Sequence, residues 1–118
     1  FYTEDRKIHP YEGIQNIAKN KELDAVVCYN DQNAMGVIRA LEALDLKIPD
    51  DVSVTGYDNF YMANQSDFRL TSIAHPQEKL GEMAAELLLD LVVNGENSEK
   101  QKIMIEPELV EGTSCKRR

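Results

Sequence analysis

The segment from Tyr29 to Asn59 constrains the fold of this 118-residue chain more than any other stretch. An apolar run meets the polar pair Asn30-Asp31, a helical apolar stripe follows, and a second apolar run stops at Gly56-Tyr57-Asp58-Asn59. This order predicts a β-α-β unit in which both strands end in side chains that form hydrogen bonds. In open parallel sheets, ligands bind beyond the carboxyl ends of the strands, so a small polar molecule is expected there.

Apolar periodicity predicts the other elements of an α/β domain with a parallel sheet. The run Ala25–Tyr29 is apolar on both faces, which is typical of strands covered by helices on each side. Asp31 is expected to cap the helix after this run, because its carboxylate can accept from the N–H groups of the first turn. The expected helices are 11–21, 32–45 and 76–93, and the expected strands are 25–29, 52–55, 70–74 and a last one around Ile103 and Ile105.

The charge balance argues against direct contact between this segment and nucleic acid. The chain has 21 acidic and 13 basic residues and a formal charge of -8, and such a surface repels phosphate groups. No apolar run approaches membrane-spanning length, so no membrane partner is expected. Two cysteines and two histidines without close spacing predict no disulfide framework, zinc site or cofactor, and they fit a reducing cytoplasm.

Five residues are expected to bind the ligand, and each also has a structural explanation. Asn30 and Asp31 follow the first strand, Tyr57 and Asp58 follow the second, and His75 lies beyond a third. Helix capping explains Asp31 equally well, although capping and ligand binding can hold at once. Turn formation explains Tyr57 and Asp58. A lone histidine such as His75 is more often structural than functional. Two polar ends on adjacent strands nevertheless favour a binding site over either explanation alone.

Catalysis is the weaker alternative for these residues. Asp31 and Asp58 could form a pair of carboxylates for acid–base chemistry. However, the chain contains no GxSxG elbow, no HExxH, no P-loop and no dinucleotide fingerprint. The chain is therefore not expected to be an enzyme.

Three stretches carry a resemblance to a known family: YNDQNAMGVIRALEALDLKIPDDVSVTGYDN, LTSIAHPQEKLGEMAAELLLDLV and IMIEPELVEGTSC. In this order and spacing they resemble the C-terminal, effector-binding part of LacI/GalR-family transcriptional regulators. The combination of CYNDQ with SIAHP is most similar to the arabinose-responsive regulators, in which a GntR-type DNA reader is fused to a LacI-like sensor.

The resemblance implies a Rossmann-like, three-layer subdomain of the kind found in periplasmic binding proteins, as a fragment of a two-subdomain sensor. A sugar would bind between the subdomains of a cytoplasmic homodimer and change its affinity for operator DNA, which a missing N-terminal domain would contact. By position, Asn30 and Asp31 match the family's ND pair, Asp58 matches the acidic residue that grips sugar hydroxyls, and His75 matches a polar position near the pocket.

The resemblance also implies how the chain is divided. Residues 1–75 and 102–118 would form the ligand-binding subdomain, and residues 76–101 would pack on a first subdomain that this chain lacks. Dimer contacts would come from the outer face of the helix at 32–44 and from Phe60-Tyr61-Met62, with exchange of the helix at 76–93 as a further possibility. The chief alternative is a solute-binding protein of a transport system, which shares this architecture. One departure from the family is the lack of an arginine near residues 111–114.

Overall fold

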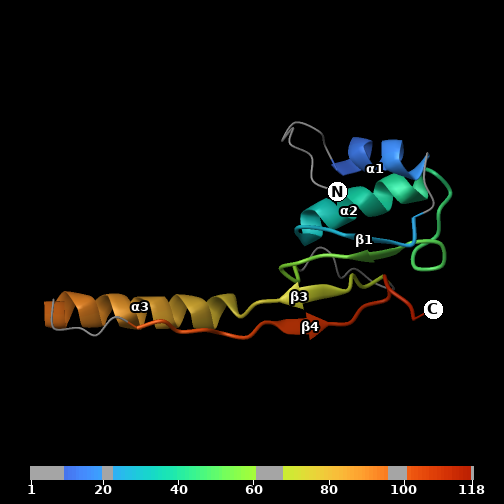
Figure 1. Cartoon of the computed structure of the whole chain (residues 1–118). Coiled ribbons are helices and arrows are strands. Elements are labelled where there is room, and N and C mark those ends of the chain that lie inside the picture. Colours follow the sequence, from blue (N-terminus) through green and yellow to red (C-terminus); the bar gives the residue numbers. More distant parts are fainter. Residues whose placement is uncertain (1–9, 20–22, 61–67, 96–100, 118) are drawn as a thin grey trace. The chain divides into compact units, whose positions relative to one another are not determined.

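The computed structural model describes residues 10–19, 23–60, 68–95 and 101–117 (Figure 1). Contacts divide the chain into two compact units, Phe1–Ala74 with Leu109–Arg118, and His75–Glu108. Each unit is described by itself below. The elements in chain order are α1 (Pro10–Ala18), β1 (Ala25–Val27), α2 (Asp31–Glu42), β2 (Ser53–Thr55), β3 (Ser72–Ala74), α3 (Gln77–Asn94) and β4 (Glu108–Val110).

The first unit is built on the predicted β-α-β arrangement. β1 and β2 pair in parallel, with Val26 opposite Val54 in the register. A parallel bridge between Thr55 and Thr71 then joins β2 to the segment that leads into β3. The carboxyl ends of three successive extended segments therefore lie at the same edge, as a parallel α/β sheet requires.

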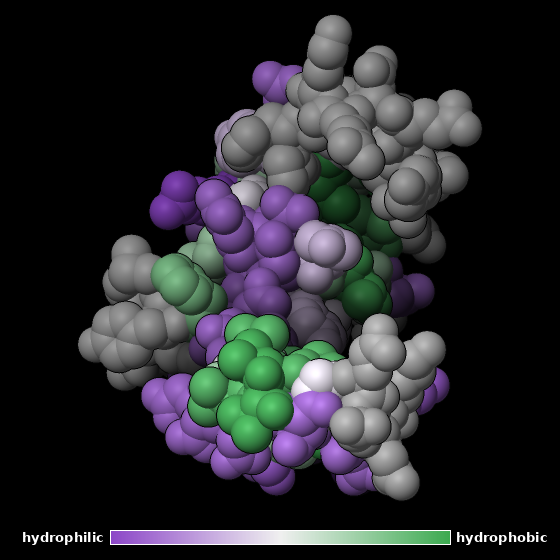
Figure 2. Space-filling view, turned by 90° about the vertical axis from the view of Figure 1, so that its left-hand side faces the viewer, coloured by the Kyte–Doolittle hydropathy of each residue, from purple (hydrophilic) through white to green (hydrophobic). Residues whose placement is uncertain are grey.

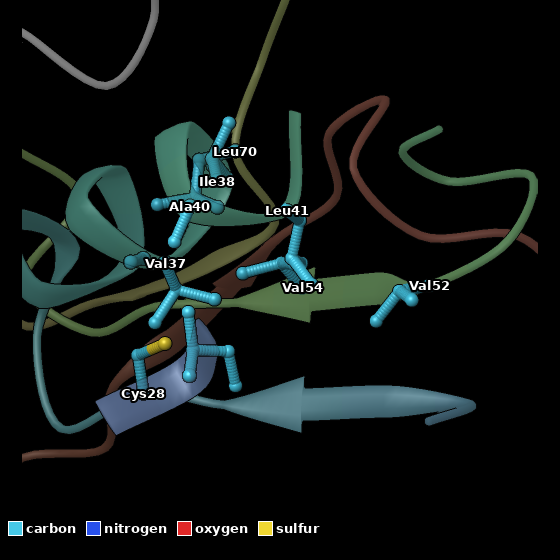
Figure 3. Packing of buried hydrophobic residues seen from close by; sticks show 10 residues of the cluster. Cys28, Val37, Ile38, Ala40, Leu41, Val52, Val54 and Leu70 are labelled. Atoms are coloured by element: carbon cyan, nitrogen blue, oxygen red, sulfur yellow. The ribbon is translucent and has the colours of Figure 1, made fainter. Parts of the chain in front are cut away.

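The core of the first unit lies between α2 and the strands. Four of the five residues of the predicted stripe are buried on α2, with side chains that point toward Val54 on β2 (Figure 3), whereas the fifth, Leu44, lies beyond the helix and is half-buried. α1 packs against α2 and contributes Ile14 to the same cluster. Ala40 and Leu41 are fully buried, so α2 is held by packing as well as by its own hydrogen bonds. The buried cluster comprises Ile14, Cys28, Ala34, Val37, Ile38, Ala40, Leu41, Val52, Val54 and Leu70.

Only one face of β1 is covered by the described residues. Cys28 is buried on the side of α2, whereas Val27 is 84% exposed and Tyr29 is 87% exposed. Successive side chains of a strand point to opposite faces, so this alternation marks one covered and one open face. The expectation that helices cover both faces of the run Ala25–Tyr29 is therefore wrong for the part of the chain that the structure describes.

The boundaries of α2 differ from the prediction at both ends. The N-cap is Asn30 and not Asp31, because the Asn30 side chain accepts a hydrogen bond from the backbone N–H of Asn33 at 2.8 Å. The helix ends at Glu42, and Asp45 beyond it has a left-handed φ of 58°. A left-handed residue cannot continue a right-handed helix, so the pattern up to Asp45 overstated its length.

The predicted strand around Ile103 and Ile105 is wrong. Residues 101–107 have no regular structure, and β4 begins after Pro107, at Glu108. β4 pairs with β3, and the two run in opposite directions (Figure 1). A strand forms where a neighbouring backbone supplies its hydrogen bonds, and an alternating apolar pattern does not show where that neighbour lies.

The second unit contains the long helix α3. Pro76 precedes its first turn, and Gly95, with a φ of 57°, terminates it as predicted. None of its residues is buried, and Figure 2, which faces the carboxyl end of this helix, shows hydrophobic side chains gathered on the surface. The exposed apolar residues of this helix include Leu88, Leu89, Leu91, Val92 and Val93. Within the described ranges, no helix is both long and apolar enough to cross a membrane.

The buried stripe of α2 should account for a large part of the stability of the first unit. We expect Leu41→Ala to lower the free energy of unfolding by about 2–5 kcal/mol, because it removes a fully buried side chain and leaves a cavity. Leu89→Ala in this 118-residue chain is the matched control on α3, where the leucine is 63% exposed, and it should change stability by less than about 0.5 kcal/mol. Urea unfolding followed by circular dichroism measures both. Equal losses for the two variants would contradict this assignment of the core.

Candidate functional site

The structure brings four of the five expected site residues together in the first unit. Asn30 and Asp31 follow β1, and Tyr57 and Asp58 follow the neighbouring strand β2. The backbone N–H of Asp31 donates to the carbonyl oxygen of Tyr57 at 2.8 Å, which joins the two strand ends directly. His75 comes immediately after β3 and is the first residue of the second unit, where its ring Nε2 lies 3.5 Å from the side-chain nitrogen of Gln77.

Asp31 lies beneath the surface of this site. It is only 1% exposed. Its Oδ1 accepts the hydroxyl of Ser72 at 2.6 Å, and its Oδ2 accepts the backbone N–H of Phe60 at 2.6 Å. A buried carboxylate is stable only when hydrogen-bonded, and these two bonds meet that need. Asp31 therefore connects three segments of the chain at this edge of the sheet.

Asp58 lies in a turn of unusual backbone geometry. Its φ is 102°, and the φ of Asn59 is 51°, both in the left-handed region that disfavours residues other than glycine. The backbone N–H of Asp58 donates to the carbonyl oxygen of Ile73 at 2.9 Å, which anchors the turn to β3. The side chain of Asp58 is half-buried, and Tyr57 is exposed. Strained backbone of this kind persists where surrounding contacts hold it, and it is common at binding sites.

Ser72 is a member of this cluster that the sequence pattern did not identify. Its hydroxyl donates to Asp31 and accepts the backbone N–H of Asn59 at 3.1 Å. The residue is the first of β3 and is 2% exposed. A serine without a motif around it looks unremarkable in a sequence. Its place at the third strand, beside two polar strand ends, was the available clue.

Gly56 allows the close approach between β2 and Asp31. A Cβ atom at this position would collide with Oδ1 of Asp31 and would lie 2.8 Å from Cδ2 of Leu70. The backbone N–H of Gly56 also donates to the carbonyl oxygen of Thr71 at 2.9 Å. The glycine is therefore required by the buried carboxylate beside it.

Ser114, in the C-terminal segment, forms hydrogen bonds with β2 and with the segment that leads into β3. Its hydroxyl accepts the backbone N–H of Thr71 at 2.8 Å and donates to the carbonyl oxygen of Val54 at 2.6 Å. Its backbone carbonyl accepts from the N–H of Val54 at 3.0 Å, and the residue is fully buried. The last residues of the chain thus support β2 from the side opposite β1, away from the turn that carries Asp58.

Cys28 has no thiolate character near neutral pH. Burial raises the pKa of its thiol to about 11, and the nearby negative charge of Asp31 contributes in the same direction. The thiolate is the form that attacks electrophiles and binds metals, so Cys28 acts as a small core residue. Among the residues that the structure describes, no group of three or more His, Cys, Asp or Glu side chains could hold a metal ion.

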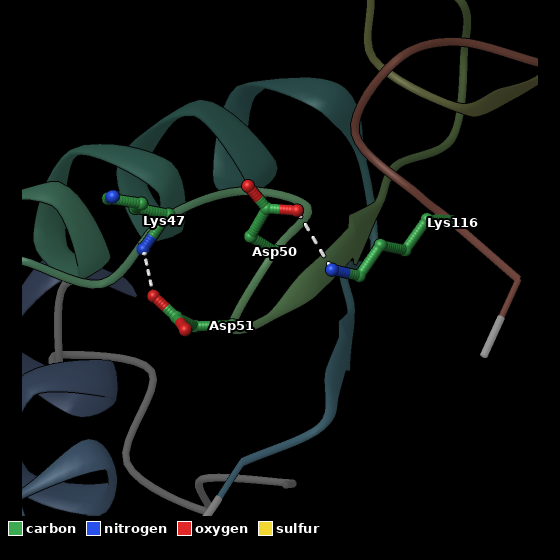
Figure 4. A network of polar contacts seen from close by, with 4 residues as sticks. All are labelled: Lys47, Asp50, Asp51 and Lys116. Atoms are coloured by element: carbon green, nitrogen blue, oxygen red, sulfur yellow. Dashed lines mark hydrogen bonds and ion pairs between the residues drawn. The ribbon is translucent and has the colours of Figure 1, made fainter.

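A surface hollow of about 460 Å³ lies elsewhere in the first unit. It is lined by Phe68 and by residues between Glu42 and Asp50, at the start of β2, whereas Asp58 follows the end of that strand. Next to it, Asp51 accepts the backbone N–H of Lys47 (Figure 4). The hollow is open and mixed in polarity, and its position excludes it as the site at the strand ends.

Figure 4 also shows an ion pair near this hollow, between the C-terminal segment and the turn that precedes β2. Lys116 Nζ lies 2.8 Å from Oδ1 of Asp50, and this hydrogen bond and the lysine charge lower the pKa of the aspartate. Ion pairs on a protein surface contribute little to stability. The pair therefore locates the segment without holding it strongly.

Comparison with known proteins places these features in context. Residues 2–115 match a family model described as a periplasmic binding protein-like domain. The HTH-type transcriptional repressor PurR of Photorhabdus laumondii is 41% identical over 105 residues, which cover 88% of this chain and 30% of that protein. The arabinose metabolism transcriptional repressor of Geobacillus stearothermophilus is 31% identical over 119 residues, covering 98% of this chain and 33% of that protein.

One similar solved structure is, like these relatives, a transcriptional regulator. The LacI family transcriptional regulator from Enterococcus faecium, determined with bound ribose, matches with a TM-score of 0.78 and 32% identity. The match covers 90% of this chain and 39% of that chain. The chain spans about a third of the length of the curated relatives that it matches.

The contact between Gly56 and Asp31 can be tested by adding one methyl group. We expect Gly56→Ala to lower the free energy of unfolding by about 1–3 kcal/mol, because the new Cβ has no room beside the carboxylate. Gly81→Ala in α3 is the matched control, because a Cβ there meets nothing within 4 Å. It should raise helix stability by about 0.5–1 kcal/mol. Thermal unfolding measures both, and a neutral Gly56→Ala variant would show that the turn is not tightly packed.

Proposed function

The chain belongs to the family of periplasmic binding protein-like domains, and from this premise we propose that it is the ligand-sensing part of a LacI-type transcriptional regulator. The resemblance to LacI-type regulators expected from the motifs is confirmed, since the relatives are transcriptional repressors and a LacI family regulator shares the fold. The relatives named above are transcriptional repressors and not enzymes. They favour a role in regulation over a role in solute transport.

The ligand class we propose is a sugar or a similarly polar small molecule, which binds at the carboxyl ends of the strands. The observation that supports this proposal most is the left-handed turn at Asp58 and Asn59, which lies beside Asn30 and Asp31 at the strand ends. A carboxylate can accept two hydroxyl hydrogen bonds at once, and such charge-assisted bonds are about twice as strong as neutral ones. Asp58 is proposed as the principal contact, and Tyr57 and Asn30 as neighbours on the same edge.

Asp31 and His75 have different places in this proposal. Asp31 is only 1% exposed and its carboxylate oxygens accept hydrogen bonds from Phe60 and Ser72, so its proposed part in binding is to support the turn that carries Asp58. His75 follows β3 in sequence, where the chain passes from the first unit into the second. We propose that it contacts the ligand from this crossover.

The whole protein is proposed to be longer than this chain, with the second unit packed on another subdomain. Residues 76–101 are the proposed contact, because no residue of α3 is buried in this chain and its apolar side chains are exposed. A ligand enclosed between two subdomains would change their arrangement and, through a DNA-binding domain, the affinity for operator DNA. Such a regulator would be cytoplasmic and would have no catalytic role.

Asp58 is the residue to test first, in the full-length protein. We expect Asp58→Asn to weaken the binding of ribose or arabinose by about 2–3 kcal/mol, because the ligand hydroxyls would lose a charged acceptor. Asparagine is chosen because it tolerates left-handed backbone better than alanine does. Isothermal titration calorimetry gives the affinities.

Asp45→Asn is the matched control for this experiment. Asp45 also has a left-handed φ, of 58°, and the substitution removes the same charge before β2 and not after it. Its sugar affinity should equal that of the wild-type protein. Equal weakening by both variants would indicate a general effect of charge, and no weakening by Asp58→Asn would exclude Asp58 as a contact.

A homodimer is proposed as the assembled state. Phe60 follows the Asp58 turn and is 60% exposed, and it belongs to the segment from which the resemblance to LacI-type regulators implies dimer contacts. The predicted outer face of the helix at 32–44 carries the exposed residues Gln32, Arg39 and Glu42, so its contribution would be polar. Tyr61 and Met62 lie outside the described residues.

Sedimentation of the full-length protein at micromolar concentration should report a dimer, with Phe60→Ser shifting it toward monomer. Loss of one of the few side chains that carry most of the binding free energy weakens association by more than about 1 kcal/mol. Met104→Ser is the control, since Met104 is also an exposed apolar residue but belongs to the second unit. A wild-type monomer would refute the homodimer.

A further inference from the structure

The turn from Tyr57 to Phe60, the 57–60 turn, is fastened at both ends by Asp31. The backbone N–H of Asp31 donates to the carbonyl oxygen of Tyr57 at 2.8 Å. Its Oδ2 accepts the backbone N–H of Phe60 at 2.6 Å. The carboxylate is buried at the start of α2, so the turn is tied to the helix as well as to the sheet.

Ser72 fastens the middle of the same turn. Its hydroxyl accepts the backbone N–H of Asn59 at 3.1 Å and donates to Oδ1 of Asp31 at 2.6 Å. A hydroxyl has one proton to give and lone pairs to accept with, so Ser72 links the carboxylate to the turn. Both residues are at least nine-tenths buried, which keeps water from replacing these bonds.

The turn needs such support because its backbone is strained. Asp58 has a φ of 102° and Asn59 has a φ of 51°. Backbone of this kind costs free energy unless its surroundings compensate. The direction of the Asp58 side chain depends on these backbone angles, so a turn that relaxed would move the carboxylate.

We propose that Ser72, acting with Asp31, is a positioning residue for ligand binding, because the pair holds the 57–60 turn in the conformation that presents Asp58. The proposal rests on the proposed role of Asp58 as the ligand contact. Ser72 itself does not touch the ligand. Its effect on affinity passes through the backbone of Asn59 and the carboxylate of Asp31.

Ser114 offers a matched control for a test of the turn itself. Like Ser72, it is buried, accepts one backbone N–H and donates one hydrogen bond, but its partners are Thr71 and Val54. Ser72→Ala and Ser114→Ala therefore remove equivalent hydroxyls. Only the first removal acts on the 57–60 turn.

Amide hydrogen exchange in the full-length protein reads out the turn without any ligand. Ser72→Ala should speed exchange at Asn59 and Phe60 on the order of tenfold, as expected for the loss of one buried hydrogen bond. Ser114→Ala should leave both amides protected and speed exchange at Thr71. Ser72→Thr, which keeps the hydroxyl, should restore protection. Unchanged exchange in Ser72→Ala, or equal loss of protection in Ser114→Ala, would overturn the proposal.

Ribose and arabinose titrations of the same variants then connect the turn to binding. Ser72→Ala should weaken binding on the order of tenfold and Ser114→Ala should not. In a protein that already carries Asp58→Asn, Ser72→Ala should add no further loss, because residues that act through one contact are not additive. A full additional loss would show that Ser72 acts independently of Asp58.

The two proposals fail in different ways. If Asp58→Asn weakens sugar binding and Ser72→Ala does not, the positioning role falls and the proposed function stands. If the wild-type protein binds neither ribose nor arabinose, these two sugars are excluded as its ligand, and the exchange measurement still decides whether Ser72 anchors the 57–60 turn.

Discussion

The buried carboxylate of Asp31 is the contact on which the edge of the sheet depends. It joins the start of α2, the turn after β2 and the first residue of β3, through hydrogen bonds to Phe60 and Ser72. Burying a carboxylate costs free energy unless its oxygens are paired, so these segments must come together for the fold to form. The absence of a side chain at Gly56 is a consequence, because the carboxylate occupies the space that a Cβ would need.

This arrangement separates support from recognition at the proposed site. The side-chain oxygen of Asn30 caps α2, and the carboxylate oxygens of Asp31 accept hydrogen bonds from Phe60 in the turn and from Ser72. Asp58 is half-buried and belongs to the turn whose backbone Asp31 and Ser72 hold. A rigid supporting layer under a more exposed polar residue is the arrangement that precise hydrogen bonding to a small ligand requires.

Local sequence patterns predicted the elements of the fold well where the burial pattern is one-sided. The stripe Ala34, Val37, Ile38, Leu41 and Leu44 placed α2, although Leu44 lies beyond the end of the helix and is only half-buried. Asn94-Gly95 placed the end of α3. The failures came where a distant partner decides the outcome. Asp31 was expected to cap the helix, but its carboxylate is directed to residues about 30 and 40 positions away. The last strand formed beside β3, not at the alternating residues Ile103 and Ile105.

The sequence by itself determined the β-α-β order, the polar strand ends and the resemblance to LacI-type regulators, because these features depend on neighbours in the chain. Only the tertiary structure decided that Asn30 caps α2 and that Asp31 anchors the 57–60 turn. Ser72 carries no motif, and its role appears only when β3 is beside the 57–60 turn. A hydrogen bond is defined by distance in space, so its partners cannot be read from the spacing of residues along the chain.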